Sequence, residues 1–471
     1  MLLIKSSKTL VLLSLLISLS AALSAWSITD TYFGNKITNL DARSYAMGGA
    51  GVFNDQRPFG ISVNPANLTL MKKQIGIQGA AFVIRNEDNR SLPLYNSFDN
   101  YIDDAVYASN INSYDDYASA GFSALSFGDL RIGLGAYFKP LLSFDGNYVE
   151  EIRNNRNTDN DVYPEKIAQN MIENSGVLNQ SAGVLSFGFG LGEIADINLG
   201  VDYAKLNGSS TMLKTIRWSQ WAANVTGPNI LPAYTQTVET DLNGSQLKVG
   251  TGIRVNNRFG FAVTQTFMAT LDRTGFNRIQ REAYRNTLAI DTTVVIGEDY
   301  ILPSEIRVGF LYQPRNIMRT WFNFDVEFVK WSDISSHYDD VVNFYAGVEH
   351  HVENRLPLRL GFQAQHNYFY NEEADGSIIV KKVLSPMITA GSSFPLTKSL
   401  TIDLGFGYSW REYEALDMFK DTYYNDKLYT GNSTYVLWPN QYIVLRDRGW
   451  ENPDKVKENN VSFNSSITFT W

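Results

Sequence analysis

The sequence predicts an all-β protein: a fourteen-stranded antiparallel transmembrane β-barrel with an N-terminal plug, or hatch, inside the lumen. Segments in which apolar and polar residues alternate recur in pairs, and a period of two places one side-chain set on each face of a strand. Each pair is joined by a tight turn and is separated from the next pair by a longer polar stretch. Transmembrane barrels show this arrangement, with short turns on one rim and long loops on the other.

We predict the first strand at 74–86 and the last at 459–471. Six hairpins are predicted between them, at 118–127/130–140, 180–189/196–206, 245–255/259–272, 303–313/319–331, 342–350/357–369 and 386–394/400–411. The strand count is even, and most segments exceed the roughly 9–11 residues that cross a bilayer at a tilt. With both chain ends in the periplasm, the short turns lie on the periplasmic rim. The long connections then lie outside, at 87–117, 141–179, 207–244, 273–302, 332–341, 370–385 and 412–458.

The chain divides into three predicted parts, which are a signal peptide (1–25), a hatch (26–73) and the barrel (74–471). Lys5 and Lys8 precede a short apolar run, and small residues follow it up to Ala25, as in a cleaved secretory signal. The alternative is a membrane-anchoring helix, but a spanning helix needs roughly 20 apolar residues. Export across the inner membrane of a Gram-negative cell is therefore expected.

Composition excludes several classes of site. The chain has no cysteine, so it has no lipid-modified cysteine, disulfide, thiolate nucleophile or cysteine-based metal site. Its net charge of -9 argues against nucleic acid as a partner. The segment 157–168 has calcium-loop spacing but lacks the glycine and the final glutamate of such a loop. We predict no cofactor, no metal site and no catalytic residue; the hydrolase alternative depends on a cluster of His337 with Asp339 and Asp340.

The alternation also predicts which side chains face lipid. Phe322, Phe324 and Phe328 belong to an outward apolar set, and Asp325 and Glu327 to the lumen. A soluble barrel would reverse this arrangement, with the apolar set filling the core. Fourteen strands enclose a lumen too wide for side chains to fill, so water, a plug or a ligand must occupy it. The Gly-rich, turn-rich residues 26–73 are predicted to be that plug.

Two motifs in this N-terminal region resemble the hatch of the FadL family of outer-membrane transporters. The first is the run 41–52, Asp-Ala-Arg-Ser-Tyr-Ala-Met-Gly-Gly-Ala-Gly-Val, and the second is Asn64-Pro65-Ala66-Asn-Leu. The run 302–309, Leu-Pro-Ser-Glu-Ile-Arg-Val-Gly, also looks like a family segment that leads into a strand. The family fold is a fourteen-stranded barrel plugged by an N-terminal hatch, which agrees with the independent strand count.

The resemblance implies uptake of hydrophobic molecules such as long-chain fatty acids. A ligand would be captured at the outer face and pass into a pocket, and a hatch movement would release it sideways into the bilayer. Asn64, Pro65 and Ala66 would be hatch elements near the ligand path; the alternative is an ordinary Asx-Pro turn. A long acyl chain gains about 0.8 kcal/mol for each buried CH₂, so lateral release avoids an aqueous pore.

A fatty-acid carboxylate favours a nearby cation. Arg307, Lys139 and Arg411 are predicted to face the lumen in its outer half, and we expect them to bind ligand. Arg307 is the first choice because it lies in the family-like run. The alternative is that these cations form salt bridges with lumen acids such as Asp325 and Glu327, because buried charges are usually paired.

The last strand alternates to Trp471, and it resembles the C-terminal strand that the barrel-assembly machinery of bacteria binds. Outer-membrane lipid and lipopolysaccharide are expected partners. Acidic residues of the 87–117 connection would bind lipopolysaccharide through divalent cations; the alternative is that these acids only form a hydrated loop whose charges repel one another. Three other functions stay open: a diffusion porin, a structural or shuttle component of a secretion machine, and the hydrolase.

Overall fold

The structure is a computed structural model of the 471-residue chain. It describes residues 27–28, 33–38, 40–54, 57–71, 73–95, 100–154, 165–192, 194–218, 234–283, 288–315, 319–351, 356–372, 378–415, 418 and 454–471. The predicted signal peptide, the calcium-like segment 157–161 and most of the last long connection lie outside these residues.

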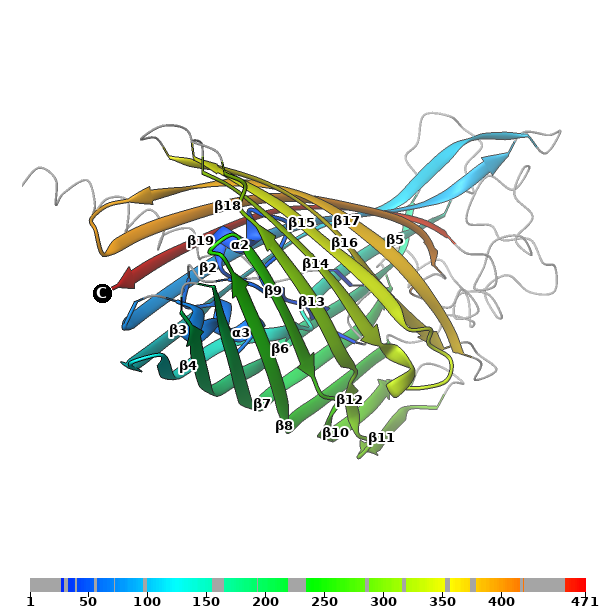
Figure 1. Cartoon of the computed structure of the whole chain (residues 1–471). Helices are drawn as coiled ribbons and strands as arrows, with labels where there is room; N and C mark the ends of the chain where they lie inside the picture. Colours follow the sequence, from blue (N-terminus) through cyan, green and yellow to red (C-terminus); the bar gives the residue numbers. More distant parts are fainter. Residues whose placement is uncertain are drawn as a thin grey trace, which may run out of the picture.

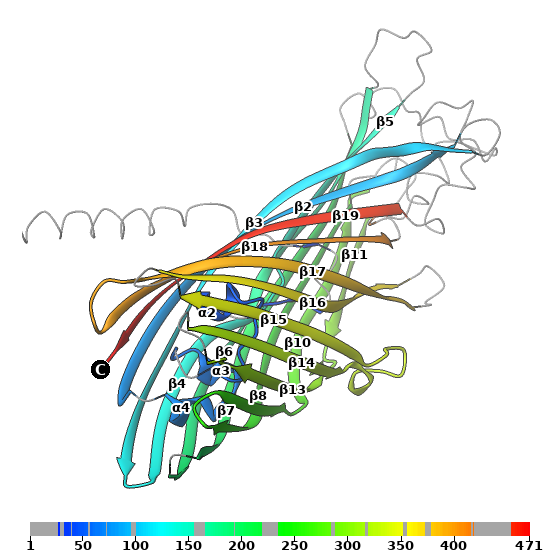
Figure 2. The same ribbon diagram turned by 45° about the horizontal axis from the view of Figure 1, so that its top comes forward.

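The described strands form one closed antiparallel barrel (Figures 1 and 2). Its wall has fourteen strands in this part of the chain, as predicted, and β19 pairs with β2 to close it. Closure leaves no free edge among the wall strands. The wall consists of β2 (Ile75–Tyr95), β3 (Tyr101–Phe127), β4 (Leu130–Ser143), β6 (Glu165–Leu191), β7 (Ala195–Trp218), β8 (Tyr234–Val255), β9 (Phe259–Thr266), β13 (Ser304–Tyr312), β14 (Thr320–Lys330), β15 (Val341–His351), β16 (Pro357–Glu372), β17 (Ile378–Pro395), β18 (Leu400–Ala415) and β19 (Asp454–Thr470).

Short strands extend the wall at the end that carries the long connections. One of them, β5 (Gly146–Asn154), pairs with β6. The others are β10 (Ala269–Arg281) and its partners β11 (Ile290–Ile296) and β12 (Tyr300–Leu302). A 3-10 turn, η1 (Trp331–Asp333), follows β14 at the same end. The C-terminus lies at the opposite end, as Figure 1 shows. The turns that join the predicted hairpins are at that end, as predicted, although the connections 96–100 and 373–377 at the other end are also only five residues long.

Five of the seven predicted long loops were wrong in kind. The structure has strand over most of 87–117, 141–179, 207–244, 273–302 and 370–385. The wall strands β2, β3, β6, β7, β8, β16 and β17 run past their predicted ends, and β5, β10, β11 and β12 lie in these stretches. Past the membrane, both faces of a strand meet water or polar groups, so the alternation disappears while the backbone ladder continues. The pattern of side chains therefore marked only the part of each strand that lies in lipid.

The wall strand predicted at 259–272 is interrupted. β9 ends at Thr266 and β10 begins at Ala269, and the two residues between them, Phe267 and Met268, are both exposed, at 43% and 49%. Two successive outward side chains are the mark of a β-bulge, which bends the strand and shifts its register. The wall is thus irregular beside the lumen pocket described below, where β4 also shifts its register against β6, between Pro140 and Leu142.

The predicted facing of the side chains is confirmed. Along β14, Phe322 and Phe324 are 46% and 45% exposed, whereas Asn323 and Asp325 are 4% and 1% exposed. Apolar residues on the outside and polar residues on the inside fit a wall that is solvated by lipid. None of the described helices is long and apolar enough to cross a membrane.

The described residues of 33–71 lie inside the barrel, with the helices toward the short turns (Figure 1), whereas Phe33 packs on Trp331 at the end of the long connections. They form β1 (Asn35–Lys36), α2 (Ala42–Tyr45), α3 (Gly60–Val63) and α4 (Asn67–Leu70). Asp41 begins α2, and its carboxylate accepts from the backbone N–H of Ser44 at 3.1 Å, as expected of an N-cap aspartate. Apolar residues from this segment, including Ile61 and Leu68, pack with the wall residues Phe122 and Tyr137 in one buried cluster.

Candidate functional site: a plugged lumen and its pocket

Glycines on the inner face of the wall make room for the N-terminal segment. A Cβ at Gly200 would lie 2.4 Å from the carbonyl carbon of Pro65, and one at Gly361 would lie 1.9 Å from the backbone nitrogen of Gly48. Such distances do not occur between real atoms, so these wall positions admit only glycine while the segment is in place. The close fit holds the segment against several strands at once.

The predicted motif residues Asn64, Pro65 and Ala66 lie at this contact. The side chain of Asn64 accepts from the Ala66 N–H at 3.0 Å, which is the expected Asx turn. Its amide also donates to the carbonyl of Thr251 in the wall, at 3.1 Å, and to that of Val52 at 3.0 Å. Asn64 therefore forms the local turn and also ties the segment to β8. The two interpretations of the motif, an Asx-Pro turn and an element of the plug, do not exclude each other.

The backbone conformation explains why residues 48 and 49 of the other motif are both glycine. Both residues have positive φ, at 67° and 78°. Only glycine adopts this region without strain, and a Cβ on Gly48 would also lie 2.3 Å from the carbonyl oxygen of Phe362. The pair thus permits a sharp turn pressed directly against the backbone of β16.

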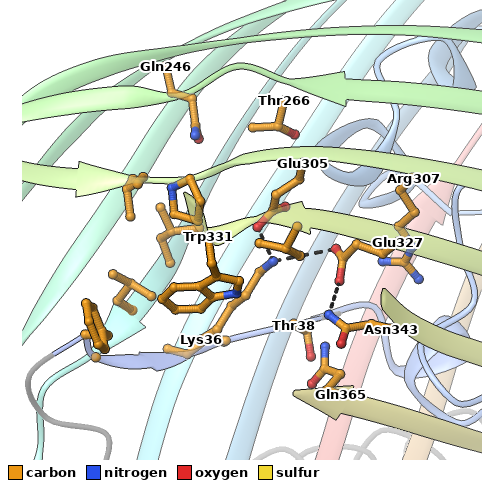
Figure 3. A pocket seen from close by; sticks show the side chains of 18 of the residues that line it. Lys36, Thr38, Gln246, Thr266, Glu305, Arg307, Glu327, Trp331, Asn343 and Gln365 are labelled. Carbon is orange, nitrogen blue, oxygen red and sulfur yellow. Dashed lines mark hydrogen bonds and ion pairs between the residues drawn. The ribbon is translucent and has the colours of Figure 1, made fainter. Parts of the chain in front are cut away.

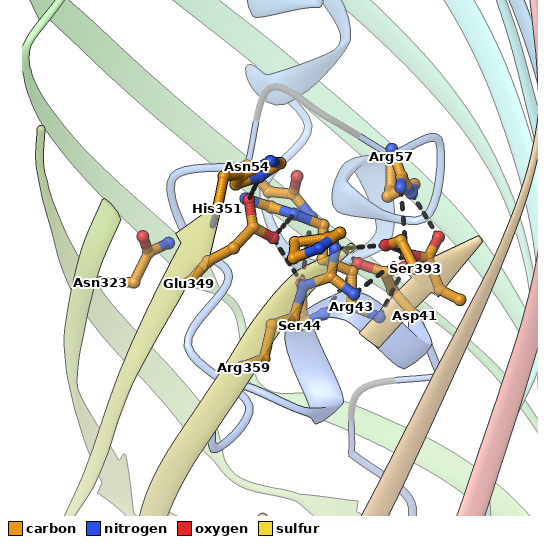
Figure 4. Close-up of polar contacts among 12 residues, drawn as sticks. Asp41, Arg43, Ser44, Asn54, Arg57, Asn323, Glu349, His351, Arg359 and Ser393 are labelled. Carbon is orange, nitrogen blue, oxygen red and sulfur yellow. Dashed lines mark hydrogen bonds and ion pairs between the residues drawn. The ribbon is translucent and has the colours of Figure 1, made fainter. Parts of the chain in front are cut away.

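Charged pairs fasten the segment to the wall on one side of the lumen (Figure 4). Arg57 binds the carboxylate of Asp403 through two nitrogens, at 2.6 and 3.0 Å, and Arg43 Nε lies 2.8 Å from Glu349 Oε2. Arg359 joins both acids, at 2.6 Å to Glu349 and 3.1 Å to Asp403. Burial alone would lower the pKa of Arg57, but the Asp403 carboxylate outweighs it and raises that pKa above its usual value. Arg57 therefore stays charged, and Glu349 and Asp403 both have cationic partners.

Beyond the segment, toward the long connections, the lumen holds a pocket that we call pocket 1. Its cavity volume is about 150 Å³. Apolar and charged side chains line it together (Figure 3). An engineered protein cavity of comparable size accommodates benzene, so pocket 1 admits a ring or part of an alkyl chain. The lining includes Ile37, Val63, Leu142, Leu302, Val329 and Trp331 on the apolar side, and Lys36, Lys139, Lys248, Glu305, Arg307 and Glu327 on the charged side.

Lys36 anchors the N-terminal segment at the floor of pocket 1. Its ammonium forms an ion pair with Glu305 and lies 3.6 Å from Glu327. Burial by itself would lower the pKa of Lys36, but the two carboxylates outweigh burial and raise it. Lys248, across the pocket, donates to the Ser62 carbonyl at 2.6 Å. Both lysines thus hold the segment in place.

The three predicted ligand residues have different surroundings. Arg307 is 8% exposed; it donates to Asp325 at 2.9 Å and to the Gly49 carbonyl at 2.7 Å, and it lies 3.7 Å from the centre of the Tyr345 ring. Arg411 is not in pocket 1, and it donates to Glu458 at 2.8 Å and to Ser27 at 2.6 Å. The salt-bridge alternative thus describes both arginines.

Lys139 differs from the two arginines. It lines pocket 1, and it makes no hydrogen bond or ion pair with the described residues. Lys36, Lys248, Glu305 and Glu327 were not selected from the sequence as ligand residues, although they share the pocket with it. The position of Lys36 depends on how the N-terminal segment folds into the lumen, which no periodicity reveals. Lumen-facing glycines such as Gly200 and Gly361 were the available signal of where the segment touches the wall.

In the described part of the chain, no group of three His, Asp or Glu side chains is arranged to hold a metal ion. The His337–Asp339 segment lies on the surface after η1, where His337 approaches Ser335 Oγ at 2.8 Å. The structure does not bring these residues toward the lumen pocket.

Comparison with family models found no match to the sequence, and comparison with curated proteins also found none. Solved structures do share the fold. A Pseudomonas aeruginosa FadL homologue superposes with a TM-score of 0.58 at 12% identity, covering 93% of this chain and 99% of its own. The Pseudomonas putida toluene transporter TodX gives 0.54 at 13% identity, covering 94% and 99%. The Ralstonia pickettii toluene transporter TbuX gives 0.51 at 14% identity, covering 95% and 99%. The resemblance predicted from residues 41–68 is thereby confirmed at the level of the fold, which is that of FadL-type barrels.

Proposed function

We propose that this chain carries hydrophobic molecules across the outer membrane of a Gram-negative cell and that long-chain fatty acids are among them. The observation that supports this most directly is pocket 1, where apolar side chains and Lys139, a lysine without a partner among the described residues, line the same cavity inside a plugged barrel. An acyl chain would contact the apolar wall, and its carboxylate would bind Lys139. Charge-assisted hydrogen bonds of this kind contribute about 1.5–3 kcal/mol.

The plug argues against an open diffusion porin. It packs closely on wall glycines, and charged pairs such as Arg57 with Asp403 tie it to the wall, so the lumen is occupied along the described part of this segment. We propose that residues 26–73 act as a hatch whose movement lets ligand leave the pocket. The bulge at Phe267 and Met268 is our candidate for sideways release, because Gln246 and Thr266 of pocket 1 lie beside it. Lateral exit keeps the ligand in apolar surroundings.

A disulfide lock tests this proposal. Thr69 on α4 and Ser186 on β6 approach with their hydroxyl oxygens 2.8 Å apart, and the chain has no cysteine of its own. The double variant Thr69→Cys, Ser186→Cys therefore places the hatch and the wall within reach of a disulfide. Each single cysteine variant is the matched control.

Cells that produce the wild-type chain should take up radiolabelled dodecanoate faster than cells with an empty vector. Oxidation of the double variant should reduce uptake to the vector level, and a reductant should restore it, while the single variants respond to neither. Wild-type uptake at the vector level would refute the transport function. Full uptake by the oxidised lock would leave transport intact but would refute the hatch movement.

A further inference from the structure

A second cavity, pocket 2, lies on the other side of the N-terminal segment. Its volume is about 100 Å³, and it borders β16, β17, β18, β19 and β2. Residues 36–38 form part of both pockets and separate them, and Gln365 and Asn367 also line both. Pocket 2 is therefore a distinct compartment that shares one wall with pocket 1.

A chain of hydrogen bonds runs between the two pockets. It begins at Glu327 in pocket 1, whose carboxylate accepts from Tyr345 Oη at 2.5 Å. Tyr345 Oη accepts from Gln365 Nε2 at 2.7 Å, and Gln365 Oε1 accepts from Gln363 Nε2 at 2.5 Å. Every donor in this chain thus points toward Glu327.

The direction of the chain is set by chemistry. An ionised carboxylate only accepts hydrogen bonds, so Tyr345 must donate its single proton to Glu327. Tyr345 then accepts, so Gln365 must present its NH₂ group there and its oxygen to Gln363. Gln363 in turn must use its NH₂ group on Gln365. The atom of Gln363 that remains is its carbonyl oxygen, which is an acceptor.

This oxygen has no partner among the described residues. Gln363 is only 5% exposed, it lines pocket 2, and its Oε1 is a buried acceptor without a hydrogen bond. A buried polar atom left unpaired costs about 1–3 kcal/mol. Ser385 Oγ, also in the lining of pocket 2, is likewise unpaired.

The two cations in the lining of pocket 2 are both paired with acids. Arg411 forms an ion pair with Glu458 at 2.8 Å, and Lys36 forms ion pairs with Glu305 and Glu327. The apolar part of the lining includes Leu40, Phe82, Ile84, Met387 and Phe463. The compartment thus combines an apolar wall with a buried acceptor. It differs from pocket 1, where Lys139 has no partner within the described part of the chain.

We propose that pocket 2 is a binding site for small neutral molecules that carry a hydrogen-bond donor on an apolar body, such as phenols or short alcohols, with Gln363 Oε1 as the acceptor. A hydrocarbon leaves that oxygen unpaired, and a carboxylate brings a second acceptor. The site goes beyond the proposed carriage of fatty acids, and it exists or fails independently of transport.

Binding of three fluorinated probes to the purified full chain in detergent tests the proposal. The probes are 4-fluorophenol, its near-isostere 4-fluorotoluene, and 4-fluoroanisole, whose oxygen only accepts. Affinities come from ¹⁹F NMR titrations, each corrected for partition into detergent alone. The phenol should bind at least about fivefold more tightly than either other probe, as expected when a ligand satisfies a buried acceptor.

Two variants locate the preference. Gln363→Met keeps the length of the side chain but removes the acceptor, and it should abolish the preference for the phenol. Gln180→Met makes the same change in pocket 1, where Gln180 Oε1 is also unpaired but no hydrogen-bond chain fixes its amide, and the preference should persist. Saturating dodecanoate, which would occupy pocket 1, should leave phenol binding unchanged.

Equal affinity of the wild-type chain for all three probes would overturn the proposal, because the hydroxyl group would then contribute nothing to binding. That result does not depend on whether any variant folds. A preference that survives in Gln363→Met, or disappears in Gln180→Met, would also overturn it. Failure of dodecanoate uptake with an intact phenol preference would refute the transport function and leave this site standing.

Discussion

Arg307 and Asp325 face each other across neighbouring strands, with Nη2 and Oδ2 2.9 Å apart. The same carboxylate oxygen accepts from the backbone N–H groups of Gly51 and Val52, at 2.7 and 3.0 Å. Asp325 thus binds a wall cation and the backbone of the N-terminal segment with one group. The first choice for a ligand residue, Arg307, is already engaged in holding that segment in place.

Substitution Asp325→Asn should loosen the N-terminal segment without opening the barrel. It leaves Arg307 without its counter-charge, and breaking a buried pair in this way costs about 3–5 kcal/mol. Limited trypsin digestion should then cut after Arg43 much faster than in the wild type, while the barrel keeps its heat-resistant mobility on gels.

The control is Asp129→Asn, which changes an exposed turn acid that has no side-chain hydrogen bond or ion pair in the described structure. It should be cut at the wild-type rate. Unchanged cutting of Asp325→Asn would show that the carboxylate does not fasten the segment.

Substitution Gly250→Ala should displace Asn64 from the wall. A Cβ at this position would lie 2.0 Å from Asn64 Oδ1, so the motif or the strand must move, and overpacking of this kind costs about 1–3 kcal/mol. Hydrogen–deuterium exchange should rise at residues 57–71. Gly183→Ala, where a Cβ would meet no atom within 4 Å, is the matched control and should leave this exchange unchanged. Equal protection in both variants would contradict the docking role of Asn64.

Substitution Lys139→Met should weaken the binding of dodecanoate about tenfold or more. The loss follows from the charge-assisted hydrogen bond that we propose between the lysine and the carboxylate. Binding of methyl dodecanoate should stay nearly unchanged, because this ester has no charge for the lysine to bind. Competition with a fluorescent fatty acid measures both ligands.

Lys205→Met, an exposed lysine of the outer face, serves as the control. Equal loss for the acid and its ester in Lys139→Met would indicate a packing effect rather than head-group recognition.

Arg411 was also predicted to bind ligand, and a double-mutant cycle separates that role from a structural one. Arg411→Gln and Glu458→Gln each break a buried pair and should lower the free energy of unfolding by about 3–5 kcal/mol. The double variant should lose less than the sum of the two, with a coupling of about 0.5–3 kcal/mol. Urea unfolding in detergent gives these values. A ligand role would appear instead as weakened dodecanoate binding in a protein of wild-type stability.

Trp471 completes the seam of the barrel. Its backbone exchanges hydrogen bonds with Ile75 of the first wall strand, at 3.1 Å each, and its ring packs on Phe469 with centroids 4.7 Å apart. If the assembly machinery binds this end of β19, then Trp471→Ala should reduce the heat-resistant, assembled fraction in cells. Refolding of the same variant from urea into detergent should succeed, because no machinery takes part. A defect in both experiments would assign Trp471 to barrel stability alone.

The sequence by itself determined the wall. Alternation such as Phe322–Asn323–Phe324–Asp325 is a local property, and lipid on one side and polar groups on the other enforce it in every membrane-crossing strand. The number of strands, the side chains that face lipid, and the end of the barrel where the hairpin turns lie all follow from that constraint. The strands beyond the membrane escaped prediction because nothing there separates one face from the other.

Only the tertiary structure decided which charges meet in the lumen. Arg307, Lys139 and Arg411 have the same predicted facing, yet two of them are bound by Asp325 and Glu458 while Lys139 is not. The difference depends on partners far away in the sequence and on the path of residues 33–71 through the barrel. Gln363 illustrates the same point, since its unpaired oxygen follows from a hydrogen-bond chain across two strands. Such long-range pairing has no periodic signature, because it is set by packing in three dimensions.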